Sequence, residues 1–131
     1  MRLVLLFLAL GGVCFAIGCD KGPTMATVTG SVTYDGKPVP EGDITFSDPE
    51  NKIAPDAGKI KDGVYTVSVK PGKKKVDIRA SKLEKLPAGK KGAMGETEMP
   101  VDYIPDKYNL KSELTADVAG GTNKFDFTLK P

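Results

Sequence analysis

Short segments in which apolar and polar residues alternate, each followed by a turn, constrain the fold of this chain more than any other feature. The clearest covers residues 27–40, TVTGSVTYDGKPVP. Every second residue from Val28 to Tyr34 falls on one side of an extended chain, which is the period of a half-buried β-strand. Asp35 and Gly36 then supply residues that tolerate a positive φ in a tight hairpin turn.

The same pattern recurs along the rest of the chain, where Asp62-Gly63 predicts a second hairpin and Pro71-Gly72 another turn. The further strands expected are 43–47, a short edge strand at 59–61, then 64–69, 75–81, one within 97–104, 112–118 and 124–130. Their expected inward residues are Ile44, Phe46, Tyr65, Val67, Val69, Val76, Ile78, Ala80, Leu114, Ala116, Val118, Phe125, Phe127 and Leu129. Helical periodicity is almost absent. These features predict an all-β fold, a single antiparallel β-sandwich of about seven strands, with a small barrel as the alternative.

The first 18 residues have the composition of a secretory signal. Arg2 is the one charge, and an apolar run continues into small residues up to Gly18, which is the pattern of a cleaved signal peptide. The alternative is a transmembrane helix, which needs about 20 apolar residues. The charges at Asp20 and Lys21 come too early for such a span. A signal peptide over 1–18 is therefore expected.

Both cysteines of the chain, Cys14 and Cys19, lie in or next to this leader, so no disulfide framework is predicted for the domain that follows. The sequence from Ala16 to Cys19 resembles the bacterial lipobox, although Ala16 stands where that family usually has Leu. The resemblance implies that Cys19 is joined to a diacylglyceryl group and becomes the new N-terminus. The alternative is an ordinary cleavage that leaves Cys19 as a free thiol, a liability in an oxidising compartment. Residues 19–26, which contain Gly-Pro, are expected to form a lipidated tether.

The charge balance and the lack of histidine exclude several classes of function. There are 19 Lys and Arg against 17 Asp and Glu, a formal net charge of +2. A nucleic-acid-binding domain would need a concentrated basic surface, so no nucleic-acid partner is predicted. The absence of His removes the commonest general base and the commonest transition-metal ligand.

Residues 82–96 break the strand pattern and are expected to form a long exposed loop, with a helical turn over 81–86 as an option. Nine basic residues fall between Lys70 and Lys91. One interpretation is contact with an anionic surface, such as phospholipid headgroups or an acidic glycan. The other is a solvated face whose lysines protect strand edges. The candidate contact residues are Lys82, Lys85, Lys90 and Lys91.

Catalytic and metal sites find little support. The pairs considered are Ser68 with Lys70, Ser81 with Lys82, and Glu96 with Glu98. A Ser-Lys pair requires a desolvated lysine, and these lysines lie among others near turns. Four carboxylates, Asp43, Asp48, Glu50 and Asp56, match no compact calcium loop and are explained as turn and strand residues. No catalytic residue, metal site or cofactor is predicted.

Sugar binding would use aromatic rings with polar tips, and Tyr103 and Tyr108, on either side of Pro105, are the candidates. The alternative is that one of them packs on the sandwich edge with its hydroxyl bonded to the backbone.

Two stretches, TVTGSVTYDGKPVPEGDITF and DGVYTVSVKPGKKKVDIRAS, resemble carboxypeptidase regulatory-like and transthyretin-like domains in the order and spacing of their strands and turns. The segments 104–109, 112–118 and 123–129 are similar to small bacterial lipoproteins built on that domain. The resemblance implies a prealbumin-like or Ig-like sandwich over 27–131. In larger proteins such domains are accessory modules without an active site, so no catalytic residue is transferred.

Together these observations predict a non-enzymatic, lipid-anchored β-sandwich that serves as an interaction or structural module at the cell envelope. It is expected to be exported and held at a membrane, facing the periplasm or the cell exterior. The expected partners are that membrane, through the lipid anchor, and an envelope protein or polysaccharide. The alternative hypothesis is a glycan-binding or anionic-ligand-binding protein that uses the loop from Lys82 to Lys91.

Overall fold

The computed structural model describes residues 24–131, in which β-strands make up nearly all of the regular structure. Cys14, Cys19 and the expected signal peptide lie outside the described residues. The elements in chain order are β1 (Ala26–Tyr34), β2 (Lys37–Pro38), β3 (Glu41–Ser47), β4 (Asp56–Lys61), β5 (Val64–Val69), β6 (Gly72–Arg79), β7 (Ser81–Lys85), β8 (Glu98–Asp102), the 3-10 helix η1 (Asp106–Tyr108), β9 (Thr115–Val118), β10 (Thr122–Lys124) and β11 (Phe127–Leu129).

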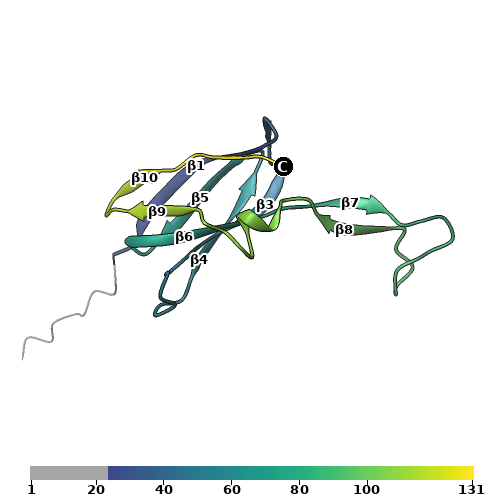
Figure 1. Ribbon diagram of the computed structural model, residues 1–131, viewed down its shortest axis with the longest axis horizontal. Helices are drawn as coiled ribbons and strands as arrows, with labels where there is room; N and C mark the ends of the chain where they lie inside the picture. The colour runs from purple at the N-terminus through teal and green to yellow at the C-terminus, as the bar shows by residue number, and fades with distance from the viewer. Residues whose placement is uncertain (1–23) are drawn as a thin grey trace, which may run out of the picture.

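The body of the molecule is one curled sheet with the strand order β10-β1-β5-β4-β3-β6-β9 (Figure 1). Neighbours pair antiparallel, except that β10 and β11 both run parallel to β1. The all-β, sandwich-like prediction is confirmed, and the C-terminal segment is tied into the sheet as expected. The predicted wholly antiparallel pairing fails only at these last strands, because the chain crosses from β9 to the free edge of β1.

The alternating pattern places the core as predicted. Val28, Ile44, Phe46, Val76 and Ile78 are fully buried, since the side chains at every second strand position face the inside of the curled sheet. Of the predicted inward residues, Leu114 and Phe125 are only partly buried and pack against this core.

Both predicted hairpin turns are confirmed. Asp35 and Gly36 have φ of 49° and 77°, and Asp62 and Gly63 have φ of 52° and 76°. A turn with two positive φ angles matches the right-handed twist of the strands it joins, which is why Asp-Gly is favoured there.

The prediction of a short edge strand at 59–61 is wrong. β4 begins at Asp56 and lies between β5 and β3, inside the sheet. Asp56 fixes its start by accepting hydrogen bonds from the Lys70 ammonium at 2.7 Å and the Lys70 backbone N–H at 2.9 Å. Burial raises the pKa of Asp56, but the hydrogen bonds and charge of Lys70 outweigh it and the pKa is lowered overall. Gly58 is needed inside this strand, because a Cβ at that position would lie 2.9 Å from the Cβ of Val67 on β5.

The prediction of a long loop or helical turn after Ser81 is also wrong. β7 pairs antiparallel with β8, and together they form a two-stranded ribbon, residues 81–102, with a loop at its tip. Every residue of β7 is exposed, so the strand has no alternation of buried and exposed positions. The ribbon could not be predicted from the sequence, because a strand is recognised there by the alternation that one buried face produces.

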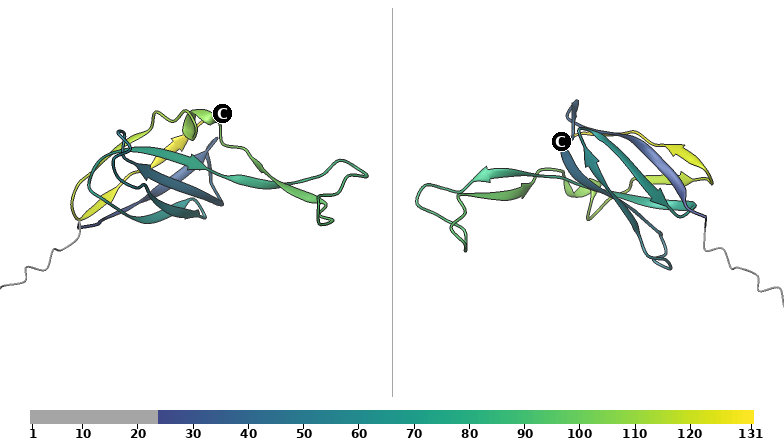
Figure 2. Two further views of the ribbon diagram at one scale, coloured as in Figure 1. Left: turned by 90° about the horizontal axis from the view of Figure 1, so that it is seen from below. Right: turned by 180° about the vertical axis from the view of Figure 1, so that it is seen from behind.

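The ribbon projects from one end of the body, and the first described residues lie at the other end (Figure 2). β1 begins at Ala26, which is buried and pairs with Val69, so the last residue of the expected tether belongs to the sheet. Within residues 24–131 no helix is long and apolar enough to cross a membrane.

Candidate functional site

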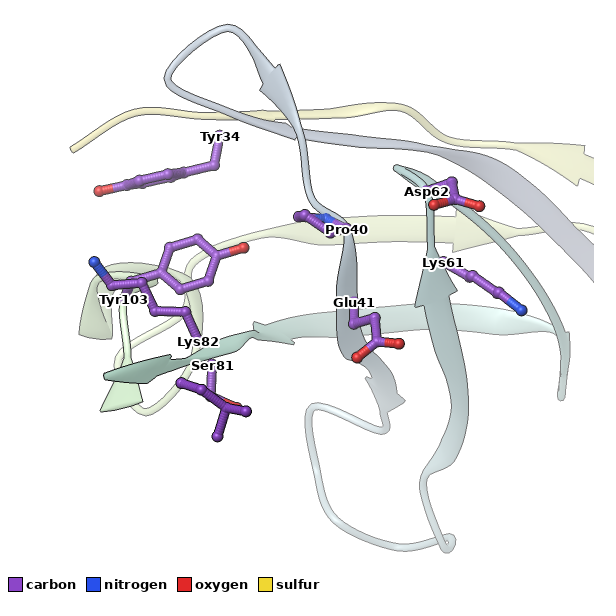
Figure 3. Close-up of a pocket in the computed structure, with 9 residues that line it drawn as sticks. Tyr34, Pro40, Glu41, Lys61, Asp62, Ser81, Lys82 and Tyr103 are labelled. Carbon is purple, nitrogen blue, oxygen red and sulfur yellow. The ribbon is translucent and has the colours of Figure 1, made fainter. Parts of the chain in front are cut away.

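A groove of about 810 Å³ lies at the base of the ribbon, where several strands end together. Figure 3 shows side chains that line it, which come from separate parts of the chain. They are Tyr34 at the end of β1, Pro40 and Glu41 at the start of β3, Lys61 and Asp62 at the end of β4, Ser81, Lys82 and Leu83 of β7, and Tyr103 just after β8.

Two tyrosines give the groove its aromatic part. The rings of Tyr34 and Tyr103 meet edge to face, with centroids 5.6 Å apart, and both side chains are partly buried. Burial raises the pKa of Tyr103, and the nearby Lys82 charge offsets this in part. The Tyr103 phenol therefore stays protonated at physiological pH and can donate a hydrogen bond.

The rim of the groove is polar and carries both signs of charge. A second hollow of about 530 Å³ shares Glu41, Lys61 and Ser81 with it and extends along the start of β3 and the end of β4. The charged residues that line the two hollows are Glu41, Asp43, Asp62 and Asp102 against Lys59, Lys61, Arg79 and Lys82. Because four acidic groups face four basic ones, this surface favours a neutral polar ligand over an anion.

Within residues 24–131 no layer covers the ribbon, since every residue of β7 and all but one residue of β8 are exposed. Leu83 and Met99 are 68% and 47% exposed, and Met94 at the tip is 91% exposed. A two-stranded hairpin is at best marginally stable alone in water, so contacts between β7 and β8 add little to the stability of the ribbon. Leu83 and Met99 lie on opposite faces, since Leu83 pairs with Pro100 and Met99 with Glu84, so each face of the ribbon presents an exposed apolar side chain.

The four candidate lysines do not form one basic surface. Lys82 and Lys85 point to opposite faces of β7 because they are three positions apart on a strand whose side chains alternate. Lys82 pairs with Glu84 at 3.0 Å, and Lys85 lies opposite Glu98. Lys90 and Lys91 are exposed in the tip loop. Across residues 81–102 the four lysines are balanced by Glu84, Glu96, Glu98 and Asp102, so the ribbon has no net charge.

Tyr103 and Tyr108 do not form a common platform. The hydroxyl of Tyr108 accepts a hydrogen bond from the Lys130 backbone N–H at 2.9 Å, and the Lys107 ammonium lies 5.1 Å from its ring centroid. Tyr108 therefore has the structural role weighed above, while Tyr103 lines the groove with Tyr34. Sequence analysis missed Tyr34, Glu41 and Leu83 as site residues, because no local pattern links such distant positions.

The catalytic pairs considered from the sequence have other roles. The Lys70 ammonium is bound by Asp56, and Ser81 and Lys82, adjacent on β7, face opposite sides of the ribbon. The carboxylate of Glu96 accepts a hydrogen bond from the Met94 backbone N–H at 3.0 Å.

The acidic residues considered for calcium are likewise separated. Asp43 pairs with Lys59 and Glu50 with Lys52, while Asp48 accepts a hydrogen bond from the Lys52 backbone N–H at 2.8 Å. In the part of the chain that the structure describes, no group of three or more His, Cys, Asp or Glu is placed to hold a metal ion.

No protein-family model matches this chain, and no curated protein matches it either. A solved structure with some likeness to it is that of a 9R-lipoxygenase from Cyanothece PCC8801, with 13% sequence identity and a TM-score of 0.44. The match covers 82% of this chain and 16% of the lipoxygenase chain. A likeness of this degree indicates neither a shared function nor a shared site.

Proposed function

We propose that this protein is a lipid-anchored, non-enzymatic β-sandwich of the cell envelope that binds a partner protein through its β7–β8 ribbon. The observation that carries the proposal is the ribbon itself, which extends beyond the body (Figure 1) and is exposed on both faces in the part of the chain that the structure describes. The anchor rests on the leader and on Cys19.

The chemistry of the ribbon supports a protein partner. Its charges balance, and moving its exposed apolar side chains, Leu83, Met94 and Met99, out of water lowers the free energy of the complex. Among the described strands β7 and β8 pair with each other alone, so an extended segment of a partner can add to the ribbon as a further strand.

The arrangement of the two ends supports the same function. The described chain begins, just before β1, at the end of the body opposite the ribbon (Figure 2). A protein attached through its N-terminal side would therefore leave the ribbon free to reach a partner.

We expect a photo-reactive residue at Ala93, in the tip loop, to form a discrete protein adduct in living cells. Ala93 is exposed in the loop that joins β7 to β8, and that loop lies well beyond the body (Figure 1). The adduct is measured by gel shift and identified by mass. The matched control is the same residue at Thr66, which is exposed on β5, and it should react far less. Equal labelling at both positions, or none at Ala93, would contradict a binding role for the ribbon.

The groove supports an alternative, a glycan-binding function, because aromatic rings beside polar groups suit a sugar. Tyr34 and Tyr103 would supply the rings, and Glu41, Lys61 and Asp62 the polar groups. In the experiment above, carbohydrate-shifted species in place of a protein adduct would put this function first. An anionic ligand on the lysines of the tip would instead show binding that weakens strongly with salt.

The anchor is tested separately. We expect cells fed a labelled fatty acid to incorporate it into the full chain and to lose that label when Cys19 is replaced by alanine. Cys14→Ala is the control and should keep the label, because Cys14 lies inside the expected signal peptide. Label that persists in Cys19→Ala would show that the chain is not acylated at this cysteine.

A further inference from the structure

We propose that β7 is a self-pairing edge, so that two copies of this chain join through an antiparallel β7–β7 contact centred on Leu83. The inference rests on the proposed function, since it names a second copy as the partner of the same ribbon. The contact would create a four-stranded sheet in which each β8 is the outer strand.

The hydrogen bonds at the ends of the ribbon show which backbone groups of β7 point toward β8 and which point away from it. The Tyr103 N–H donates to the Ala80 carbonyl at 3.2 Å, and the Leu86 N–H donates to the Thr97 carbonyl at 2.8 Å. Both pairs belong to the register of β7 with β8. In an antiparallel pair, hydrogen-bonded positions alternate with positions whose groups point outward. The backbone N–H and C=O groups of the alternate residues Ser81, Leu83 and Lys85 therefore point away from β8.

The opposite edge of the ribbon is blocked. Pro100 lies directly across from Leu83, at one of the outward positions of β8. Proline has no N–H group, and it therefore interrupts the row of donors that an added strand would need. Among the ribbon's two edges, β7 is the one that can accept a further strand.

The sequence of β7, SKLEK, is complementary to itself in one register. Outward backbone groups must face outward groups, so a self-pair can be centred on Lys82, Leu83 or Glu84. Centring on Lys82 or Glu84 places two like charges directly opposite each other, which is destabilising. Centring on Leu83 places Lys82 of each copy opposite Glu84 of the partner subunit. Those pairs are of the closer type, with Cα atoms about 4.5 Å apart, which suits an ion pair.

The same register covers apolar surface. The two Leu83 side chains meet at the centre, on the face that also holds Pro100 of each copy. Leu83 is 68% exposed in the single chain, so both copies remove apolar area from water. The contact has two-fold symmetry and closes on itself, which gives a dimer and not a filament. It also extends a marginal hairpin into a sheet of more than two strands.

The first test is a disulfide across the centre of the contact. Leu83→Cys in the full chain, treated in cells with a mild oxidant, should give a disulfide-linked dimer on a non-reducing gel. Facing hydrogen-bonded residues have Cα atoms about 5.5 Å apart, within disulfide range. Glu98→Cys on β8 is the matched control and should not link, because three strand spacings of about 4.8 Å separate the outer strands.

The second test reverses charges in the Leu83→Cys chain. Lys82→Glu alone or Glu84→Lys alone should lower the dimer yield about tenfold, because two cross-strand attractions become two repulsions. The double variant Lys82→Glu with Glu84→Lys should restore it. Co-expression of the two single variants with different tags should give a mixed dimer, which also shows that both variants fold.

A dimer yield that the charge reversals leave unchanged would overturn the inference, and so would the absence of a dimer at Leu83→Cys. An adduct with a different protein and no dimer would overturn self-pairing while leaving the proposed function intact. If neither Leu83→Cys nor the probe at Ala93 reacts with any protein, both proposals are wrong.

Discussion

Replacing Phe46 by alanine is expected to lower the free energy of unfolding by about 3–5 kcal/mol. Phe46 is fully buried on β3, and its ring lies 6.2 Å from that of Tyr65 on β5. It therefore fills the space between the two sides of the curled sheet, and alanine would leave a cavity there. A domain of this size has about 5–15 kcal/mol of stability in total, so the loss would be a large part of it.

The loss is measured by urea unfolding followed by circular dichroism, with the slope of the transition checked against the unchanged protein. Leu110→Ala is the matched control. It also removes a large apolar side chain, but one that is 67% exposed and lies outside the ribbon and the groove, so its effect should stay within about 0.5 kcal/mol. Similar losses for both variants would mean that β3 and β5 do not enclose a common core.

Gly30→Ala should cost about 3 kcal/mol, the upper end for overpacking, because the obstacle is backbone. A Cβ at Gly30 would lie 1.8 Å from the Phe125 carbonyl oxygen and 3.0 Å from the Tyr65 hydroxyl. The C-terminal segment would have to move away from β1. That movement would break the hydrogen bond that Tyr65 donates to the Phe125 carbonyl at 2.6 Å, and the one from the Phe125 N–H to Thr29 at 2.9 Å.

Gly30→Ala should loosen the C-terminal strands in particular, in addition to lowering the stability of the whole domain. Amide hydrogen exchange should speed up in β10 and β11 before the rest of the sheet, because these strands hold to the body through β1. Gly120→Ala is the matched control, since a Cβ there would have no heavy atom within 4 Å. If the Gly30 and Gly120 variants were equally stable, the close approach of the C-terminal segment to β1 would be wrong.

Tyr65, the buried tyrosine beside Gly30, also holds the C-terminal segment against β1. Burial raises the pKa of Tyr65, and the negative charge of Asp126 raises it further. The hydroxyl therefore stays protonated and remains a donor to Phe125. Asp126 in turn accepts a hydrogen bond from the Ser31 N–H at 2.8 Å, which lowers the pKa of that carboxyl group. The Asp126 carboxylate thus takes the place of a backbone carbonyl as the acceptor for the Ser31 N–H of β1, at the break between β10 and β11.

What the sequence determined by itself is the set of strands with one buried face. Ile44 and Phe46, or Val76 and Ile78, show this face as an alternation of apolar and polar residues over a few positions, which is local information. The Asp-Gly turns are local in the same sense, because only a few residue types accept two positive φ angles. These signals were enough for an all-β sandwich and most of its core.

Only the tertiary structure decided the rest. Lys74 continues the inward side of β6 and is 2% exposed, although lysine in a sequence predicts an outward position. β7 is exposed on both faces, so nothing in its own sequence separates a strand from a loop. Tyr34 and Tyr103 meet only because β1 and the ribbon end at the same edge of the body. These features depend on contacts between segments that are distant in the sequence. No local residue pattern contains the energy of such contacts.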